Sequence, residues 1–531
     1  MAPTSGDGLD ELAEEMESPA TPEVGSRRSR EQKRLAAAQS LGADLDATDL
    51  RGKVRHGVGW KLATVVLGQG SEALVSILLA HLLLPTDFGL AGLAIIFGGL
   101  ALGLSDIGLG AAIIQRKSLT EEDISTVFWV TAMVGVALTV LGIGFSPLVA
   151  DFFSNPQVMP LFAVLSISFL FASLGQTQRA LLTRQMSFRS LELRNIAATL
   201  AGAIAALLVA LAGFGAWAII AQVVFTSVVS TLMLWTVSPW RPRMTFSRER
   251  FRTLGGFGFK TLMMRNLVWV NLNSDNLLVG RFLGSTALGI YSVAYNLMVL
   301  PSSNITGPLR DVLYAAFARL QHDAHRLGEA WLRVNNVAGS VLVPAFLGLA
   351  AVAPDFVPVV LGSRWHAAIP VLQLLCLGGA VGSLQAFNGQ VYQALGRPGL
   401  FLRFTCFATA VMVSAFIVGL KWGVVGVAGS YAVARTIMLI VNSVQMSRLM
   451  DFDLWRMTRS YLAVFCRAGA MGAVVFAARS ALLHLGAPVG VRLVVLIVSG
   501  TLVYLALTFL FAPAVVRDVR EGLLRRRVAT A

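Results

Sequence analysis

Charged side chains are scarce in this sequence, and acidic ones are scarcer than basic ones. Of the 531 residues 14% are charged and 56% are hydrophobic, and Lys and Arg outnumber Asp and Glu by 43 to 29. A soluble domain has about a quarter charged residues and under half apolar ones. The composition therefore argues against a soluble protein. It predicts an integral membrane protein, because each spanning helix needs about 20 mostly apolar residues.

Cysteine and the common enzyme motifs are also missing or nearly so. Cys376, Cys406 and Cys466 all lie in apolar runs, without CxxC or metal-ligand spacing, so we interpret them as packing residues. Walker A, HExxH and GxSxG sequences are absent. The sequence therefore predicts a protein that is not an enzyme and that holds no metal and no cofactor.

The N-terminal region, residues 1–56, has too few apolar residues to bury a core and predicts a disordered cytoplasmic tail. All the charged side chains in 1–23 are acidic, and 27–34 then read RRSREQKR. We expect the basic part to lie on anionic lipid, with binding of a partner protein as the alternative. Because no signal peptide precedes the first apolar run, that run is expected to direct the chain into the membrane.

Apolar runs from residue 57 onward predict an all-α fold with about 14 transmembrane helices. We place them at about 59–83, 89–113, 125–150, 158–182, 196–213, 215–237, 256–282, 287–313, 334–352, 367–394, 401–420, 423–447, 460–482 and 490–513. Connections rich in Lys and Arg alternate with connections that hold almost none, apart from Arg364 and Lys421. This alternation predicts that both termini lie in the cytoplasm. The net charge of +14 thus indicates membrane topology, and we expect no nucleic acid partner.

An internal repeat indicates two six-helix lobes. LLLPTDFGLAGL (82–93) parallels FLGSTALGIYSV (282–293), which matches Gly89 with Gly289. Two further matches follow in the same order, so we expect lobes related by a pseudo-two-fold axis along the membrane normal, with a cleft between them. The predicted segments are the tail 1–56, lobes 57–240 and 256–448 joined by a basic linker 241–255, two added helices in 449–514, and a basic cytoplasmic tail 515–531.

Polar and ionisable residues gather in the first helix of each predicted lobe. Such groups are costly inside a membrane and usually face the protein interior or water, although groups near helix ends can extend to the interface instead. Further candidates lie late in the fourth and eighth predicted helices. The candidate substrate-binding residues are Lys61, Gln69, Glu72, Arg179, Lys260, Arg265, Asn271, Asn273, Asp275 and Arg310.

Residues 287–323 carry a more specific signal. They include Leu288-Gly289-Ile290-Tyr291, Leu300-Pro301 and Phe317-Ala318-Arg319-Leu320-Gln321. This segment resembles the polysaccharide-exporter, Wzx-like branch of the multidrug/oligosaccharidyl-lipid/polysaccharide flippase superfamily. Asp275 with the following Leu277-Leu278-Val279-Gly280 also fits that family's seventh helix. The resemblance covers about 57–515.

The resemblance implies movement of a polyprenyl-diphosphate-linked oligosaccharide to the outer leaflet of a bacterial plasma membrane. A diphosphate and a sugar cannot cross hydrocarbon unaided, because their desolvation cost is too large. On this hypothesis Arg265, Lys260, Lys61 and Arg179 contact anionic groups. Asn271, Asn273 and Gln69 contact sugar, and Asp275 or Glu72 pairs with a base or carries a coupling proton. Expected partners are membrane lipids, a polysaccharide polymerase and chain-length proteins.

Three other functions stay open at this point. A cation-coupled multidrug exporter would favour acidic and aromatic residues, whereas the predicted helices here carry as many bases as acids. A lipid-linked peptidoglycan-precursor flippase would share the mechanism. A membrane-bound polymerase or ligase would need a large exposed loop, but the connections between the predicted helices are short.

Overall fold

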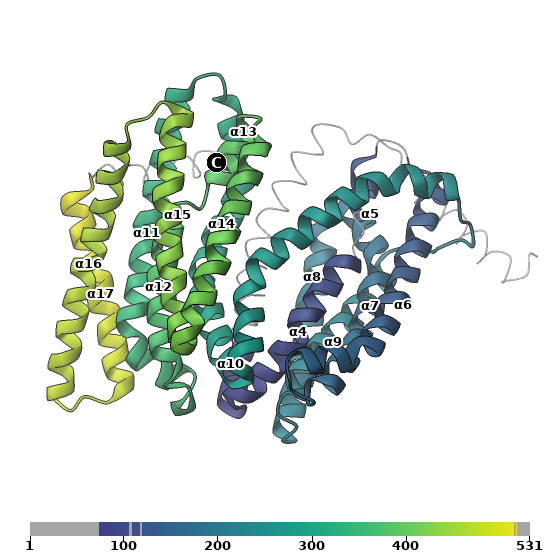
Figure 1. The fold of residues 1–531 in the computed structure, drawn as a ribbon, viewed down its shortest axis with the longest axis horizontal. Helices are drawn as coiled ribbons and strands as arrows, with labels where there is room; N and C mark the ends of the chain where they lie inside the picture. Colours follow the sequence, from purple (N-terminus) through teal and green to yellow (C-terminus); the bar gives the residue numbers. More distant parts are fainter. Residues whose placement is uncertain (1–73, 106–108, 117–118, 514–516, 518–531) are drawn as a thin grey trace, which may run out of the picture.

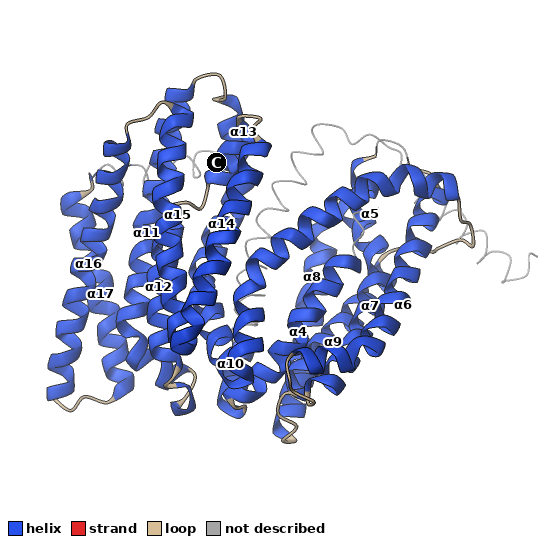
Figure 2. Ribbon diagram, viewed as in Figure 1, coloured by secondary structure: helices blue, strands red, loops and turns tan. Residues whose placement is uncertain are grey.

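The computed structural model of the chain describes residues 74–105, 109–116, 119–513 and 517. These residues form helices and turns without any strand (Figure 2). The long and short α-helices are α4 (Pro85–Ser105), α5 (Leu109–Gln115), α6 (Glu121–Phe152), α7 (Val158–Arg184), α8 (Phe188–Leu211), α9 (Trp217–Val237), α10 (Arg248–Arg319), α11 (Ala324–Val360), α12 (Ala368–Ser383), α13 (Asn388–Ala394), α14 (Pro398–Gly419), α15 (Gly423–Met450), α16 (Leu454–His484) and α17 (Val489–Phe511). Two short 3₁₀ turns are η1 (Ser363–Trp365) and η2 (Leu420–Trp422).

Eleven helical stretches of the described residues are long and apolar enough to cross a membrane. The predicted all-α, many-span membrane fold is therefore confirmed. The count of 14 stays a prediction for two reasons. Most of the first expected helix, 59–83, lies outside the described residues. Elsewhere two expected helices run together, as in Leu272–Ser303 and Pro398–Met450.

The helices form two groups that meet at one end (Figure 1). One group holds α4 to α9 and the other holds α11 to α17, while α10 reaches across both. The break inside α10 is at Gly284, whose φ is +84°. Only glycine adopts this conformation without steric cost, and it lets α10 reverse direction where the two groups meet. The arrangement of these groups as two symmetric lobes with the expected boundaries stays a prediction.

Helix α4 of the first group meets the second segment of α10, residues 285–319, through the pair of glycines matched by the repeat. A Cβ atom on Gly89 would lie 1.7 Å from the carbonyl oxygen of Ser285. A Cβ atom on Gly289 would lie 1.8 Å from the carbonyl oxygen of Pro85. Neither position can accept a side chain unless the backbones move apart. The reciprocal contact brings α4 and the second segment of α10 together backbone against backbone.

Other contacts close the same end of the molecule. The Trp365 indole N–H donates to the carbonyl oxygen of Ala80 at 2.9 Å. The Trp365 ring also meets that of Phe88 edge-on at 5.2 Å. Arg281 donates to the Ser154 hydroxyl at 2.9 Å. The loop-charge prediction places this closed end on the outer side of the membrane.

The first segment of α10 leans against the first group of helices. A Cβ atom on Gly99 would lie 2.8 Å from Trp269 Nε1, and one on Gly103 would lie 2.9 Å from Asn266 Oδ1. These glycines of α4 therefore let α10 approach closely. Figure 1 shows α10 arching from the group with α6 and α7 to the group with α11 to α15.

Candidate functional site

A buried carboxylate lies in the first segment of α10. Asp275 is 4% exposed. Its side chain accepts a hydrogen bond from the Tyr291 hydroxyl at 2.8 Å and another from the backbone N–H of Asn276 at 2.8 Å. Because Tyr291 belongs to the second segment of α10, this bond ties together the two segments that diverge from Gly284.

Three tyrosines connect Asp275 to an arginine on α15. The Tyr291 and Tyr295 rings stack at a centroid distance of 6.1 Å, and Tyr295 meets Tyr431 edge-on at 6.3 Å. The Arg435 guanidinium lies over the Tyr431 ring at 5.0 Å. We call Asp275, Tyr291, Tyr295, Tyr431 and Arg435 the aromatic–charge network.

This network lies near the middle of the membrane-spanning helices. At 1.5 Å per residue, Asp275 is about 14 Å and Tyr295 about 16 Å along their helical segments from Gly284. Arg435 is about 18 Å from the start of α15 at Gly423. The hydrocarbon core of a bilayer is about 30 Å thick. Asp275 and Arg435 thus lie about half of that thickness from the ends of their helical segments, and charged groups inside membrane-spanning helices usually have a functional role.

Arg435 is not fully satisfied by the protein. Its Nε is buried and finds no hydrogen-bond partner among the described residues. A Cβ atom on Gly382 of α12 would lie 3.5 Å from Arg435 Cδ, an ordinary van der Waals distance, so the arginine lies directly beside α12. Arginine offers five N–H donors in a planar fork that matches phosphate. The network can therefore present a cation to an anionic group while Asp275 offsets part of its charge.

Of the residues predicted from the sequence, the network contains Asp275. Asn273 is its neighbour on α10, but the Asn273 amide donates to the carbonyl oxygen of Trp269 at 3.0 Å. Arg179 is an exposed residue of α7. Arg310 is an exposed residue about 22 Å beyond Tyr295 along α10. The structure does not bring these two arginines to the network.

The remaining predicted residues fall outside the described part. Lys61, Gln69 and Glu72 precede residue 74. Lys260, Arg265 and Asn271 lie on the helical backbone of α10, but their side chains are not among those described. Within the described residues no group of three or more His, Cys, Asp or Glu side chains is placed to hold a metal ion.

Sequence reasoning did not select Arg435 or the three tyrosines. Arg435 is an ionisable residue in the middle of an apolar run, and that position could have marked it as a candidate site residue. Tyr291 and Tyr295 are four residues apart and so share one helix face. The contact of that face with Tyr431 comes from the packing of α10 against α15, which the sequence does not show.

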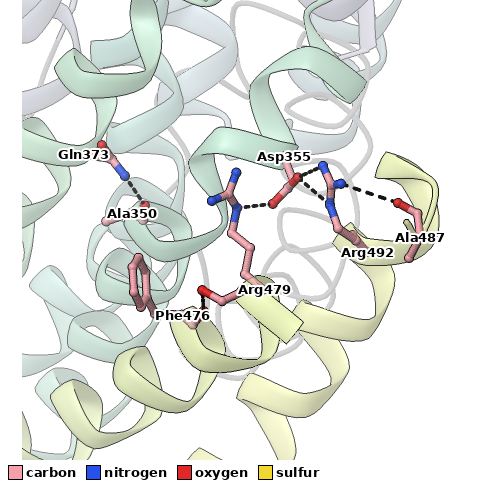
Figure 3. Close-up of polar contacts among 8 residues, drawn as sticks. Ala350, Asp355, Gln373, Phe476, Arg479, Ala487 and Arg492 are labelled. Carbon is pink, nitrogen blue, oxygen red and sulfur yellow. Dashed lines mark hydrogen bonds and ion pairs between the residues drawn. The ribbon is translucent and has the colours of Figure 1, made fainter. Parts of the chain in front are cut away.

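A second buried carboxylate attaches the last two helices (Figure 3). Asp355 of α11 is fully buried and forms ion pairs with Arg479 of α16 at 2.6 Å and with Arg492 of α17. Arg492 Nε also donates to Asp355 at 3.0 Å. One carboxylate thus holds two helices to α11. The ion pairs lie at the end of the molecule that includes η1.

An apolar groove runs beside this cluster, between α11, α16 and α17. It encloses ≈ 440 Å³. Its walls are mainly aliphatic and aromatic, with Leu349, Phe356, Met471 and Leu496 among them. Tyr504 lines it too, and its hydroxyl donates to the carbonyl oxygen of Ser340 at 2.7 Å. The groove suits a hydrocarbon chain better than a sugar.

We expect Tyr291→Phe to destabilise the protein, because it removes the hydroxyl that donates to a buried carboxylate. Loss of one partner of a buried hydrogen bond costs about 1–3 kcal/mol. The midpoint of thermal unfolding, measured on the purified protein in detergent, should fall. Tyr295→Phe is the matched control, because among the described residues the Tyr295 hydroxyl has no hydrogen bond. Equal effects of the two changes would contradict the assigned bond.

A family model and two related proteins place the chain in the same family. Residues 78–370 match the family described as polysaccharide biosynthesis protein. The chain is 30% identical over 396 residues to the lipopolysaccharide biosynthesis protein WzxC of Escherichia coli K12, covering 74% of this chain and 80% of that protein. It is 28% identical over 408 residues to the teichuronic acid biosynthesis protein TuaB of Bacillus subtilis, covering 76% of this chain and 84% of that protein.

The fold also resembles that of a solved flippase. The structure of the lipid II flippase MurJ in an inward closed conformation superposes with a TM-score of 0.65 at 16% identity, covering 85% of this chain and all of that one. This similarity concerns the fold alone. The family model matches more than half of the sequence, and the similarity to WzxC covers most of the WzxC chain. The chain therefore belongs to the polysaccharide biosynthesis protein family of membrane transporters.

Proposed function

We propose that the protein moves a lipid-linked oligosaccharide, carried on a polyprenyl diphosphate, from the cytoplasmic to the outer leaflet of a bacterial plasma membrane. The observation that carries this proposal is the match, over four fifths of its relative's length, to a protein named for lipopolysaccharide biosynthesis. The relative named for teichuronic acid biosynthesis agrees in substrate class. The glycan made with this chain would be an exopolysaccharide, a capsule or an O-antigen.

The geometry supports a role in moving an anionic, amphipathic substrate. The aromatic–charge network holds the Arg435 guanidinium at mid-depth, where a diphosphate needs compensation for its lost hydration. The groove between α11, α16 and α17 offers an apolar wall for the polyprenyl chain. Closure at the Gly89–Gly289 contact keeps the outer end shut in this state. Alternating access then requires that contact to open.

We further propose roles for the other residues that the sequence selected, six of which have side chains outside the described part. Lys61, Lys260 and Arg265 contact the diphosphate, with Arg179 and Arg310 nearer the cytoplasmic entrance. Gln69, Asn271 and Asn273 contact sugar hydroxyl groups. Asp275 or Glu72 pairs with a base or carries a coupling proton. Both termini lie in the cytoplasm, and a polymerase and chain-length proteins act on the product in the outer leaflet.

The test is outward translocation of a labelled lipid-linked glycan in cells that lack the native gene. We expect Arg435→Gln to lower the rate at least tenfold, because it removes the positive charge at mid-depth, which corresponds to about 1.4 kcal/mol. Arg435→Lys should retain part of the activity. Lys421→Gln, which removes one exposed positive charge in η2, is the matched control and should behave as the unchanged protein.

The same strain separates the alternatives. If the single variants Arg435→Gln, Arg265→Ala and Asp275→Ala all kept full activity, the assignment of the site would be wrong. Sensitivity of the deletion strain to many cationic drugs, with unchanged surface glycan, would favour a multidrug exporter. Loss of viability through failed cell-wall synthesis would favour a peptidoglycan-precursor flippase.

A further inference from the structure

The helical hairpin α14–α15 contains a hollow that the proposed transport path does not use. It encloses ≈ 610 Å³ at the end where α14 begins and α15 ends. By the loop-charge prediction this is the cytoplasmic end. The lining residues are three arginines, one glutamine and a set of apolar side chains: Arg397, Arg403, Arg448, Gln445, Leu400, Phe404, Phe407, Val441, Val444 and Leu449.

The hollow exists because small residues hold the hairpin closed only at its other end. A Cβ atom on Gly419 would lie 2.6 Å from Ser430 Oγ, and one on Gly426 would lie 2.3 Å from the Gly419 carbonyl oxygen. There α14 and α15 pack backbone to backbone. At the arginine end, side chains as large as Phe404 and Phe407 line the space between the helices.

Among the described residues the three arginines have no acidic partner. Within the described residues, no ion pair or hydrogen bond of the Arg397, Arg403 or Arg448 side chain is found. Arg241, which follows the corresponding hairpin of the first half, differs. Its guanidinium donates to the carbonyl oxygens of Trp235, Ser238 and Trp240. The second hairpin thus gathers three cations that the described protein leaves uncompensated.

A glutamine, Gln445, also lines the hollow beside the arginines. The Tyr392 hydroxyl donates to Gln445 Oε1 at 2.8 Å, which fixes the amide group of Gln445 at the edge of the hollow. The amide nitrogen of Gln445 forms no hydrogen bond with any other described residue. It is therefore available to donate to an anion held by the arginines.

The lining of the hollow changes from arginines at the end of the hairpin to apolar side chains farther along both helices. Along α14 the arginines come first, and Phe407 lies about 15 Å beyond Arg397 at 1.5 Å per residue. Along α15, Val444 and Val441 lie on the membrane side of Arg448 by about 6 and 10 Å. Phe407 is 46% exposed. Only 6% of the most apolar stretch of Pro398–Met450 is buried, the lowest share among the candidate spans, so this hairpin faces lipid.

We propose that this hollow binds a lipid with a phosphate headgroup from the cytoplasmic leaflet. The phosphate lies among the three arginines, which bind phosphate oxygens through paired N–H donors. The hydrocarbon chain lies against Phe404, Phe407 and the valines. Basic pockets between membrane helices on the cytoplasmic side are suited to such headgroups. Three cations balance a diphosphate better than a single phosphodiester, so the order of affinity should be polyprenyl diphosphate, then phosphatidylglycerol, then phosphatidylcholine.

The proposal can be tested by native mass spectrometry of the full-length protein purified in neutral detergent. The probes are undecaprenyl diphosphate, phosphatidylglycerol, phosphatidylcholine and inorganic diphosphate, each titrated separately. Near a membrane surface each arginine contributes about 1 kcal/mol to binding an anionic lipid. Arg403→Gln should therefore lower affinity for the first two probes about fivefold, and Arg403→Gln with Arg448→Gln about 25-fold.

Arg459→Gln is the matched control, because Arg459 is an exposed arginine of α16 outside the hollow. It should bind both anionic lipids as the unchanged protein does. A stronger effect on undecaprenyl diphosphate would identify the hollow as a loading site for the transport substrate. Equal effects on both lipids would identify a site for membrane phospholipid, and either result supports the proposal.

Three outcomes would overturn it. One is equal binding of phosphatidylglycerol and phosphatidylcholine by the unchanged protein. Another is the same loss of binding in the Arg459 control. The third is binding of inorganic diphosphate as tight as that of undecaprenyl diphosphate, which would show that the apolar wall contributes nothing. Because these measurements report binding alone, they stand apart from the translocation assay that tests the proposed function.

Discussion

Gly289→Ala should abolish most of the transport activity, with a fall of at least tenfold in outward translocation. The added methyl group would lie 1.8 Å from the Pro85 carbonyl oxygen and 2.9 Å from the Gly89 backbone nitrogen, both of them backbone atoms that cannot rotate away. Non-bonded carbon and oxygen atoms need well over 3 Å. The contact between α4 and α10 must therefore open, and the closed end of the molecule loses its closest packing.

Gly307→Ala is the control in the same helix. A Cβ atom at Gly307 meets nothing within 4 Å, and alanine favours helix over glycine by about 1 kcal/mol. This change should leave transport unchanged and the protein as abundant in the membrane as before. Gly92→Ala is an intermediate case, since its methyl group would meet only the end of the Leu288 side chain at 3.3 Å. Normal transport by Gly289→Ala would contradict the backbone contact.

Asp355→Ala should cost about 3–5 kcal/mol of unfolding free energy, the range for removing one partner of a buried ion pair. It would leave Arg479 and Arg492 without the carboxylate that both contact. Because these arginines belong to α16 and α17, the two helices should loosen from α11 first. Limited proteolysis of the connection at 485–488, with thermal unfolding of the purified protein, would measure both effects.

Glu329→Ala provides the comparison, since it removes a carboxylate that also joins α11 to α16. The pair of Glu329 with Arg456 is 3.4 Å long, and both side chains are about half exposed. Exposed ion pairs contribute about 0–1 kcal/mol. The change should therefore have little effect. If Asp355→Ala were as mild as Glu329→Ala, Asp355 would not be the residue that fastens the last two helices.

The helical membrane fold could be predicted from the sequence because the length of an apolar run and the charge of a loop are both properties of a short stretch of chain. The repeat also selected Gly89 and Gly289 as equivalent positions. The structure adds that these two glycines lie at one contact, a fact about packing between helices 200 residues apart. Sequence periodicity describes one helix at a time and does not show which helix is its neighbour.

The candidate site was predicted less completely for the same reason. Asp275 stood out because a carboxylate is rare in an apolar run. Tyr291 and Tyr431 are common types of buried residue, and their contribution appears only where they meet Asp275 and Arg435. The break at Gly284, which brings the two segments of α10 side by side, falls between two helices that the sequence predicted as separate.

The most direct test of the account is leaflet exchange in vesicles that contain only the purified full-length chain. A fluorescent polyprenyl-diphosphate oligosaccharide is distributed over both leaflets, and dithionite, which does not cross the membrane, is added outside. If the protein moves this lipid between leaflets, label from both becomes reduced, and Arg435→Gln slows the loss of the inner pool. If only the outer pool is reduced, as in vesicles without protein, the chain does not translocate this substrate unaided and the account is contradicted.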